Sequence, residues 1–408
     1  TPHYENVPFE VPEGWVWTTL GEISTYGECN TITIDEIGKD DWILELEDLE
    51  KDTAAIIQTL TKKERSLKGV RHKFCKGEVL YSKLRTYLNK VLVAPNDGYC
   101  TTEIMPFNSF CSISTDYLCH VLRSRYFLGY TLQCGYGVKM PRLSTNDARK
   151  GMIPLPPLAE QLRIVNEIER SFAAINTLEN SKTHLQTAIK QAKNKILDLA
   201  IRGKLVPQDP NDEPASELLK RINPKVEITC DNGHYPIGWI KTILGELFSH
   251  NTGKALNSSN KEGIFKDYLT TSNVYWNKFD FTVIKQMPFK ESELDKCTVT
   301  KGDLLVCEGG DIGRSAIWNF DYDICIQNHI HRLRPKIDLC VPFYYYTFAY
   351  LKENNLIGGK GIGLLGLSSN ALHKIELPLP PLAEQQRIVQ KIEALFSVLD
   401  NIQNALEV

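Results

Sequence analysis

The sequence predicts an α+β protein: two globular mixed α/β domains, each followed by a long helix of the coiled-coil type. Three observations lead to this fold class. A segment of twelve residues occurs twice, an opening signature recurs at the same spacing, and a long proline-free stretch carries apolar residues at heptad spacing. The chain is therefore interpreted as an internal pseudo-two-fold repeat, in which position 154 returns at position 378 (378 − 154 = 224).

The repeated segment reads Pro-Leu-Pro-Pro-Leu-Ala-Glu-Gln-Leu-Arg-Ile-Val at 154–165 and returns at 378–389 with one difference, Leu162 against Gln386. A Gly-Trp pair followed by Leu-Gly-Glu opens each copy, with Trp15 and Trp239 at the same shift (239 − 15 = 224). Because both ends of a long unit repeat in one register, each copy should be a domain plus a connector.

Composition limits the class of protein. The chain has 408 residues, of which 42% are apolar, and a net charge of −3, so it has room for two or three domains with cores of their own. Its eleven cysteines contain no Cys-x-x-Cys pair, which favours reduced thiols in a cytoplasmic protein over disulfides or a zinc finger. The sequence contains no run of about 18 apolar residues, so no membrane span is predicted, and the first residues carry no signal-peptide pattern.

Charge is unevenly distributed within the first domain. Residues 61–90 carry ten Lys or Arg against two acids, a net of +8, while residues 35–52 carry nine acids against two Lys, a net of −7. The small overall charge therefore conceals a domain that we predict to be polarised.

The elements are predicted in chain order as follows. The first domain, 1–156, contains strands near 78–81 and 91–94 and a helix near 116–130. The first long helix covers 157–204; its heptad seam is Ile164, Ile168, Ser171, Ile175, Leu178, Lys182, Leu185, Ile189, Ala192, Ile196 and Leu199. At 1.5 Å per residue it would be roughly 70 Å long, which favours a coiled coil over the alternative of a buried core helix. A linker with a short helix (205–234), the second domain (235–380) and a second, shorter helix (381–408) follow.

The two domains keep a common frame and change their polar residues. Residues 76–85 correspond to 301–310 at an offset of 225 (301 − 76), and Lys83 and Arg85 are replaced by Glu308 and Gly310. A duplicated enzyme would retain its reactive residues in at least one copy, whereas a duplicated reader needs one scaffold with different contact residues.

The chain resembles the specificity subunit of type I restriction–modification systems. The resemblance lies in the doubled segment, the paired Gly-Trp…Leu-Gly-Glu openings, the Arg-Gly-Lys-Leu-Val-Pro-Gln-Asp-Pro run at 202–210, and the segments 307–318 and 327–335. It implies two target-recognition domains, each reading one half of a bipartite asymmetric site in double-stranded DNA. It also implies that the two long helices form an antiparallel coiled coil that separates the two domains, sets the spacer length and docks two methyltransferase subunits. A motor-nuclease subunit would join for restriction.

Candidate DNA contacts follow from side-chain chemistry. Basic side chains suit phosphates, Arg suits guanine, Asn and Gln suit adenine, and Glu can accept from cytosine. The candidates in the first domain are Lys83, Arg85, Tyr87, Lys90, Thr102, Glu103, Lys139, Arg142 and Ser144. Those in the second are Arg314, Gln327, Asn328, His329, His331, Lys360, Ser368 and Asn370. A solvated basic face and internally bonded strand residues are the alternatives. A two-His metal site at His329 and His331 lacks further ligands, and the glycine pattern at 361–366 is interpreted as a loop, not a nucleotide site.

The first turns of the two helices are candidate partner contacts, because identical residues in two copies suit two identical partners. These residues are Glu160, Gln161, Arg163, Glu384, Gln385 and Arg387, for which helix capping is the alternative. No methylase, Walker or nuclease motif is found, so a non-catalytic chain is expected, with S-adenosylmethionine, ATP and magnesium in partner subunits. The alternatives are a system with a fused methyltransferase–nuclease partner, a coiled-coil scaffold that does not bind DNA, and a stand-alone enzyme.

Overall fold

A computed structural model describes residues 7–110, 113–137, 140–222, 224, 234–256, 262–357 and 367–407. Lys139 and Lys360, two of the candidate DNA contacts, lie outside these residues. Contacts divide the chain into two compact units, unit 1 (Thr1–Glu179) and unit 2 (Asn180–Val408), which are described separately. Among the described residues, no helix is both long and apolar enough to cross a membrane.

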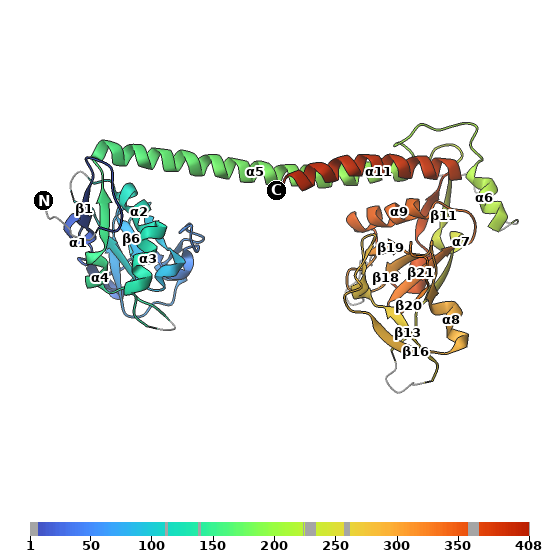
Figure 1. Ribbon diagram of the computed structural model, residues 1–408, viewed down its shortest axis with the longest axis horizontal. Helices are drawn as coiled ribbons and strands as arrows, with labels where there is room; N and C mark the ends of the chain where they lie inside the picture. The colour runs from blue at the N-terminus through green and yellow to red at the C-terminus, as the bar shows by residue number, and fades with distance from the viewer. Residues whose placement is uncertain are drawn as a thin grey trace. The chain divides into compact units, whose positions relative to one another are not determined.

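Unit 1 is built on two sheets and a strand pair (Figure 1). The five-stranded sheet has the order β2 (Asn30–Thr33), β5 (Val70–Phe74), β8 (Gly98–Thr101), β3 (Trp42–Leu44) and β4 (Leu60–Thr61). The three-stranded sheet has the order β7 (Val91–Val93), β6 (Val79–Ser82) and β9 (Ile104–Phe107). Strand β1 (Val16–Thr19) pairs with β10 (Met152–Leu155). The α-helices are α1 (Leu20–Ile23), α2 (Thr115–Arg123), α3 (Arg125–Cys134) and α4 (Thr145–Lys150), and four 3-10 turns are η1 (Ile34–Glu36), η2 (Leu46–Asp48), η3 (Lys62–Glu64) and η4 (Thr86–Leu88).

The single helix predicted near 116–130 is two helices, α2 and α3. Ser124 separates them: its hydroxyl donates to the carbonyl of Val121 (2.6 Å) and accepts from the amide of Phe127 (3.3 Å). The same side chain thus ends one helix and caps the next, which the apolar spacing alone does not reveal.

Unit 2 repeats the strand pair, with β11 (Ile240–Ile243) against β22 (Glu376–Leu379). One sheet has the order β12 (Phe248–Thr252), β21 (Ile330–Pro335), β18 (Leu304–Cys307) and β19 (Ser315–Ile317). The other has the order β16 (Lys285–Phe289), β13 (Ile264–Leu269), β20 (Ile324–Ile326) and β17 (Thr298–Val299), and β14 (Val274–Tyr275) pairs with β15 (Lys278–Phe279). The helices are α6 (Ala215–Ile222), α7 (Leu244–Leu247), α8 (Glu291–Cys297), α9 (Val341–Glu353), α10 (Ser369–His373) and α11 (Leu382–Ala405), with the 3-10 turn η5 (Thr271–Asn273).

The two units repeat in one register. Val16 faces Leu155 across the first strand pair, and Ile240 faces Leu379 across the second, so both partners move by the same offset (240 − 16 = 379 − 155). The turn before each strand is also shared, because the amide of Trp15 donates to the carbonyl of Pro12 (3.1 Å) and that of Trp239 to Pro236 (3.2 Å). The duplication read from the sequence is therefore confirmed at the level of single hydrogen bonds.

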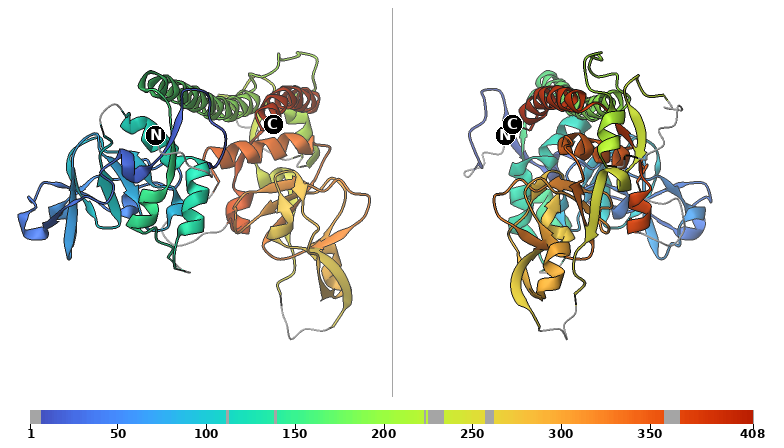
Figure 2. Two further views of the ribbon diagram at one scale, coloured as in Figure 1. Left: turned by 60° about the vertical axis from the view of Figure 1, so that its left-hand side comes forward. Right: turned by 90° about the vertical axis from the view of Figure 1, so that its right-hand side faces the viewer.

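The two long helices differ in length. Helix α5 (Leu158–Ile201) has 44 residues and α11 has 24. Within unit 2 the last turns of α5 lie beside α11 (Figures 1 and 2), and Lys193 forms an ion pair with Asp400 (2.5 Å). Ile189, a member of the predicted seam, is buried in this unit, whereas Ile196 and Leu199 of that seam are half-buried and Leu197, which lies outside it, is buried.

The middle of α5 does not form the continuous seam that the heptads predict. Its apolar side chains at Ile175, Leu178 and Leu185 are 48%, 70% and 41% exposed. A helix of 24 residues can cover only about half the length of one of 44, since both rise by about 1.5 Å per residue. The alternative of a buried core helix is excluded by the same exposure.

Candidate functional site

Three loops that are distant in the sequence meet in unit 1. The amide of Lys83 donates to the carbonyl of Glu103 (2.9 Å), and the amide of Leu143 donates to the carbonyl of Lys83 (2.9 Å). The amide of Arg85 donates to the carbonyl of Pro141 (2.6 Å). These bonds gather predicted residues from the ends of β6 and β9 and from the segment before α4 into one cluster, which we call the unit 1 loop cluster.

Unit 2 holds a matching loop cluster with the same backbone bonds. The amide of Glu308 donates to the carbonyl of His329 (2.9 Å), and the amide of Leu367 donates to the carbonyl of Glu308 (3.1 Å). Glu308 thus takes the place of Lys83, and His329 takes that of Glu103. By this pairing, residues 327–329 correspond to residues 101–103 (329 − 103 = 226).

The side chains of the two clusters differ although their backbones match. In unit 1, Arg142 forms an ion pair with Glu103, beside half-buried Lys83. In unit 2, the Nδ1 atom of His329 lies 3.6 Å from the carboxylate of Glu308. One scaffold therefore presents a basic centre in unit 1 and an acidic centre in unit 2.

Some of the unit 1 candidates are accessible and others are engaged in the fold. Arg85 and Tyr87 are exposed, and Arg85 adopts a left-handed conformation (φ 53°) that starts η4. Thr102 is half-buried in the turn between β8 and β9. Lys90 instead donates its ammonium to the carbonyl of Leu46 (2.7 Å), and burial lowers its pKa.

Ser144 is a helix cap in the structure. Its hydroxyl accepts from the amide of Asp147 (3.0 Å) at the start of α4, and Ser368 accepts from the amide of Ala371 (3.3 Å) at the start of α10. Asn370 remains exposed. The two serines therefore fix the end of each loop, a role that their repeated position did not reveal.

The unit 2 candidates divide in the same way. His329 is exposed and Gln327 and Asn328 are half-buried at the end of β20. Arg314 is engaged internally: its guanidinium donates to the carbonyl of Thr271 and lies 4.8 Å from the ring centre of Tyr275.

His331 is buried and does not share a surface with His329. Its Nδ1 lies 2.8 Å from the Nε2 of His250, and its Nε2 lies 2.7 Å from the carbonyl oxygen of Leu367. The ring of His373 packs edge-on against His250, with ring centres 4.7 Å apart. Burial, followed by the neighbouring imidazoles, lowers the pKa of His250 to about 4. Sequence spacing missed this histidine cluster because its members lie on β12, β21 and α10. Among the described residues, no group of three or more His, Cys, Asp or Glu is placed to hold a metal ion.

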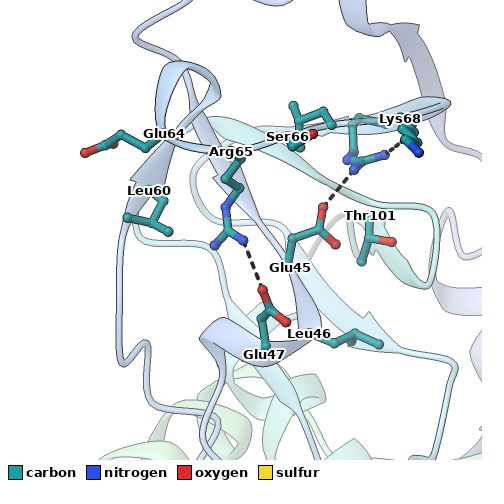
Figure 3. Close-up of a pocket in the computed structure, with 11 residues that line it drawn as sticks. Glu45, Leu46, Glu47, Leu60, Glu64, Arg65, Ser66, Lys68 and Thr101 are labelled. Atoms are coloured by element: carbon teal, nitrogen blue, oxygen red, sulfur yellow. Dashed lines mark hydrogen bonds and ion pairs between the residues drawn. The ribbon is translucent and has the colours of Figure 1, made fainter.

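The predicted charge polarity of unit 1 is offset in part by ion pairs between the two stretches. Arg65 pairs with Glu47 (3.4 Å) and with buried Asp48, and Arg71 pairs with Glu45 (2.9 Å). The Arg65–Glu47 and Arg71–Glu45 pairs line a cavity of about 630 Å³ (Figure 3), whose wall also includes Thr101 beside the unit 1 loop cluster. The basic and acidic stretches meet across β3 and β5, so part of the net charge of each is neutralised within the unit.

The two glutamines predicted to contact partners are buried, with 1% and 0% exposure. The side chain of Gln161 accepts from the amide of Ser114 (2.9 Å) and donates to the carbonyl of Pro156 (2.9 Å). Gln385 accepts from the amide of Cys340 (3.0 Å) and donates to the carbonyl of Pro380 (2.9 Å). We call each a glutamine clamp, since it ties the first turn of a long helix to its own unit. Both side chains make their hydrogen bonds inside the fold and are therefore not available to a partner.

Glu384 and Arg387 are also occupied. Glu384 is buried and accepts from Trp239 Nε1 (2.8 Å) and Gln208 Nε2 (2.6 Å), and Arg387 pairs with Asp212 (2.6 Å). Sequence reasoning missed Gln208 and Asp212, although the Gln-Asp-Pro-Asn-Asp run at 208–212 was a visible signal. In contrast, Arg163 is exposed and Glu160 half-buried, and both remain candidates for a partner contact.

Comparison with known proteins places these features in context. Residues 236–408 match the family described as type I restriction modification DNA specificity domain. The chain is 24% identical to the EcoEI specificity subunit of Escherichia coli, covering 98% of this chain and 80% of that protein. It is 30% identical to the EcoDI specificity subunit of Escherichia coli, over 42% of this chain and 39% of that protein.

The fold is shared with solved structures. The HsdS subunit from Thermoanaerobacter tengcongensis superposes with a TM-score of 0.62 at 20% identity, over 98% of this chain and 92% of that chain. A chain from a type I R-M system structure gives a TM-score of 0.64 at 20% identity, over 98% of this chain and 96% of that chain.

Proposed function

We propose that this chain is a type I restriction specificity subunit and reads DNA in a type I restriction–modification complex, because residues 236–408 match the family described as type I restriction modification DNA specificity domain and 98% of the chain aligns with the EcoEI specificity subunit. Each unit would contact one half of a bipartite, asymmetric site through its loop cluster. The long helices would set the spacing between the two halves.

One observation carries the proposal: equivalent backbone bonds hold different side chains in the two loop clusters. Lys83 and Glu308 occupy the same place between the same two hydrogen bonds, yet their charges are opposite. Selection for a shared reactive centre would keep the residue type, whereas two readers of different half-sites need the scaffold and not the side chain. Arg85, Tyr87 and His329 are exposed in or next to these clusters in the sequence and are the first candidates for contacts to phosphate or bases.

We place the chemistry in partner subunits. Two methyltransferase subunits would bind S-adenosylmethionine, and a motor-nuclease subunit would use ATP and magnesium, while this chain supplies DNA specificity and assembly. A system in which methyltransferase and nuclease are fused in one partner would use this chain in the same way.

The test is to co-express the full chain with the methyltransferase subunit of its own operon and to map adenine methylation by single-molecule sequencing. We expect one asymmetric motif made of two short half-sites with a fixed gap. Replacing the unit 1 contacts by Arg85→Ala with Tyr87→Ala should relax or weaken one half of the motif and leave the other half and the gap unchanged. His329→Ala should act on the opposite half only.

Arg170→Ala is the matched control, because Arg170 is exposed on α5 away from both loop clusters. A stable complex that methylates no motif would support the scaffold alternative. Loop variants that change both halves at once would contradict the assignment of one half-site to each unit.

A further inference from the structure

A cysteine and a histidine form a hydrogen-bonded pair in unit 1. The Sγ atom of Cys29, just before β2, lies 3.2 Å from the Nε2 atom of His72 on β5. The sheet brings the two residues together, because β2 and β5 are antiparallel neighbours and Thr31 faces His72. We call Cys29 and His72 the thiol–imidazole pair.

The direction of this hydrogen bond follows from the other nitrogen of the ring. His72 Nδ1 lies 2.9 Å from the carbonyl oxygen of Ile104, and a carbonyl oxygen can only accept. Nδ1 therefore carries the proton of the neutral ring, and Nε2 remains an acceptor. The thiol of Cys29 must be the donor, so its proton is already directed at a base.

The surroundings of His72 keep the ring neutral. Its side chain is buried, with 6% exposure, and burial lowers its pKa, which the hydrogen bond to Ile104 offsets only in part. At pH 7 the ring is therefore largely uncharged, with the Nε2 lone pair facing the thiol. A nucleophile, a base within hydrogen-bond reach and a third group that orients the base are together typical of an activated cysteine.

The other cysteines that the structure describes in unit 1 lack this combination. Cys100 and Cys119 are buried, and burial raises the pKa of both thiols. Cys75 is exposed and Cys134 is half-buried, but neither forms a hydrogen bond with a histidine among the described residues. A buried thiol with a raised pKa is inert, and an exposed thiol without a base has ordinary reactivity.

Cys29 lies where a small reagent can reach it. It is half-buried, and its neighbours Glu28 and Asn30 are exposed. The strand that follows it, β2, is the first in the order of its sheet and pairs there with β5 alone. The pair thus lies at an edge of the unit and not in its core.

We propose that Cys29, with His72 as its base, is a modification site for small uncharged oxidants of the hydroperoxide class. The sulfur attacks one peroxide oxygen, so an S–O bond forms while the O–O bond breaks. The thiol proton passes to His72 Nε2 and then to the departing hydroxide, which leaves as water. The sulfur loses two electrons, the peroxide gains them, and the product is a sulfenic acid. This chemistry goes beyond the proposed function, because neither residue is among the candidate DNA contacts.

Alkylation of the full reduced chain by iodoacetamide measures the reactivity, with mass spectrometry of peptides to follow each cysteine. At pH 7 we expect Cys29 to react roughly tenfold or more faster than Cys75, because an acceptor for its proton is already in place. His72→Asn keeps an N–H donor near the position of Nδ1 but removes the base. It should slow the alkylation of Cys29 roughly tenfold and leave Cys75 unchanged.

His120→Asn is the matched control. It makes the same change at another half-buried histidine of unit 1, which forms no hydrogen bond with a cysteine among the described residues, and should alter neither rate. The parent chain by itself compares Cys29 with Cys75, so the proposal stays testable even if His72→Asn lowers the stability of unit 1.

Hydrogen peroxide in the presence of dimedone, which traps sulfenic acids, tests the oxidation directly. We expect the adduct on the peptide that contains Cys29, its loss in Cys29→Ser, and a roughly tenfold slower appearance in His72→Asn.

Three results would overturn the proposal. The first is alkylation of Cys29 no faster than that of Cys75 in the parent chain, which would make the contact with His72 purely structural. The second is an unchanged rate at Cys29 in a folded His72→Asn chain. The third is dimedone on Cys75 with none on Cys29.

Discussion

The glutamine clamps give the sharpest prediction about the stability of each unit. Gln385→Ala removes an acceptor for the amide of Cys340, at the start of α9, and a donor for the carbonyl of Pro380, just before α11. An unsatisfied buried polar group costs about 1–3 kcal/mol, so the two together should lower the free energy of unfolding by about 2–5 kcal/mol. For a unit of this size, 1 kcal/mol corresponds to about 2–4 °C. We therefore expect unit 2 to melt about 5–15 °C lower.

Differential scanning calorimetry of the full chain measures this effect, since each unit can melt in its own transition. Gln161→Ala should lower the transition of unit 1, and Gln385→Ala that of unit 2. The matched control is Gln386→Ala, which alters the adjacent exposed residue and should shift neither transition by more than about 0.5 kcal/mol. Gln385→Glu keeps the size and the acceptor but cannot donate when ionised, so its loss should be larger at pH 7.5 than at pH 5. A shift below about 1 kcal/mol for both alanine variants would refute the clamp.

Three further predictions concern single side chains. The melting temperature of unit 2 should fall as the pH is lowered from 6.5 towards 4, because burial holds the pKa of His250 at about 4. Between those values the unfolded chain binds a proton that the folded unit does not, and His250→Gln should flatten the slope in thermal melts across pH. Asp48→Ala should lower the free energy of unfolding of unit 1 by about 3–5 kcal/mol in chemical denaturation, because it leaves the nearly buried Arg65 without its main partner. A loss under about 1 kcal/mol would contradict this prediction. Lys83→Glu should weaken DNA binding. In filter binding at several salt concentrations, it should reduce the slope of log affinity against log salt by about one phosphate contact, whereas Glu308→Gln should not reduce that slope.

The architecture could be predicted from the sequence because the spacing between the two copies of a repeat can be counted directly. The offset of 224 between the two copies relates both strand pairs, both turns and both helix starts. These features depend on the local chain and on counting, so one sequence is enough to find them.

The roles of the repeated polar residues were harder to predict. Gln161 and Gln385 suggested a surface for two identical partners, yet each is identical because it makes the same internal bonds. Likewise, Asp48 and Arg65 belong to stretches of opposite charge that meet only when β3 and β5 enter one sheet. Pattern and spacing give no information on which charged groups will face each other, and that pairing decides how much charge remains for a ligand.

The glutamine clamp at Gln161 also restrains the tilt of α5 at the residues where the helix begins. Besides Gln161, the hydroxyl of Tyr117 donates to the carbonyl of Pro154 (2.6 Å) in the segment that leads into the helix. Helix α5 has 44 residues, so at 1.5 Å per residue it is a lever of about 66 Å. A tilt of about 3° at the base moves the far end by about 3.4 Å, the rise of one base pair. Under the proposed function, in which this helix spaces two DNA contacts, the angular stiffness of one buried joint would set a tolerance counted in base pairs.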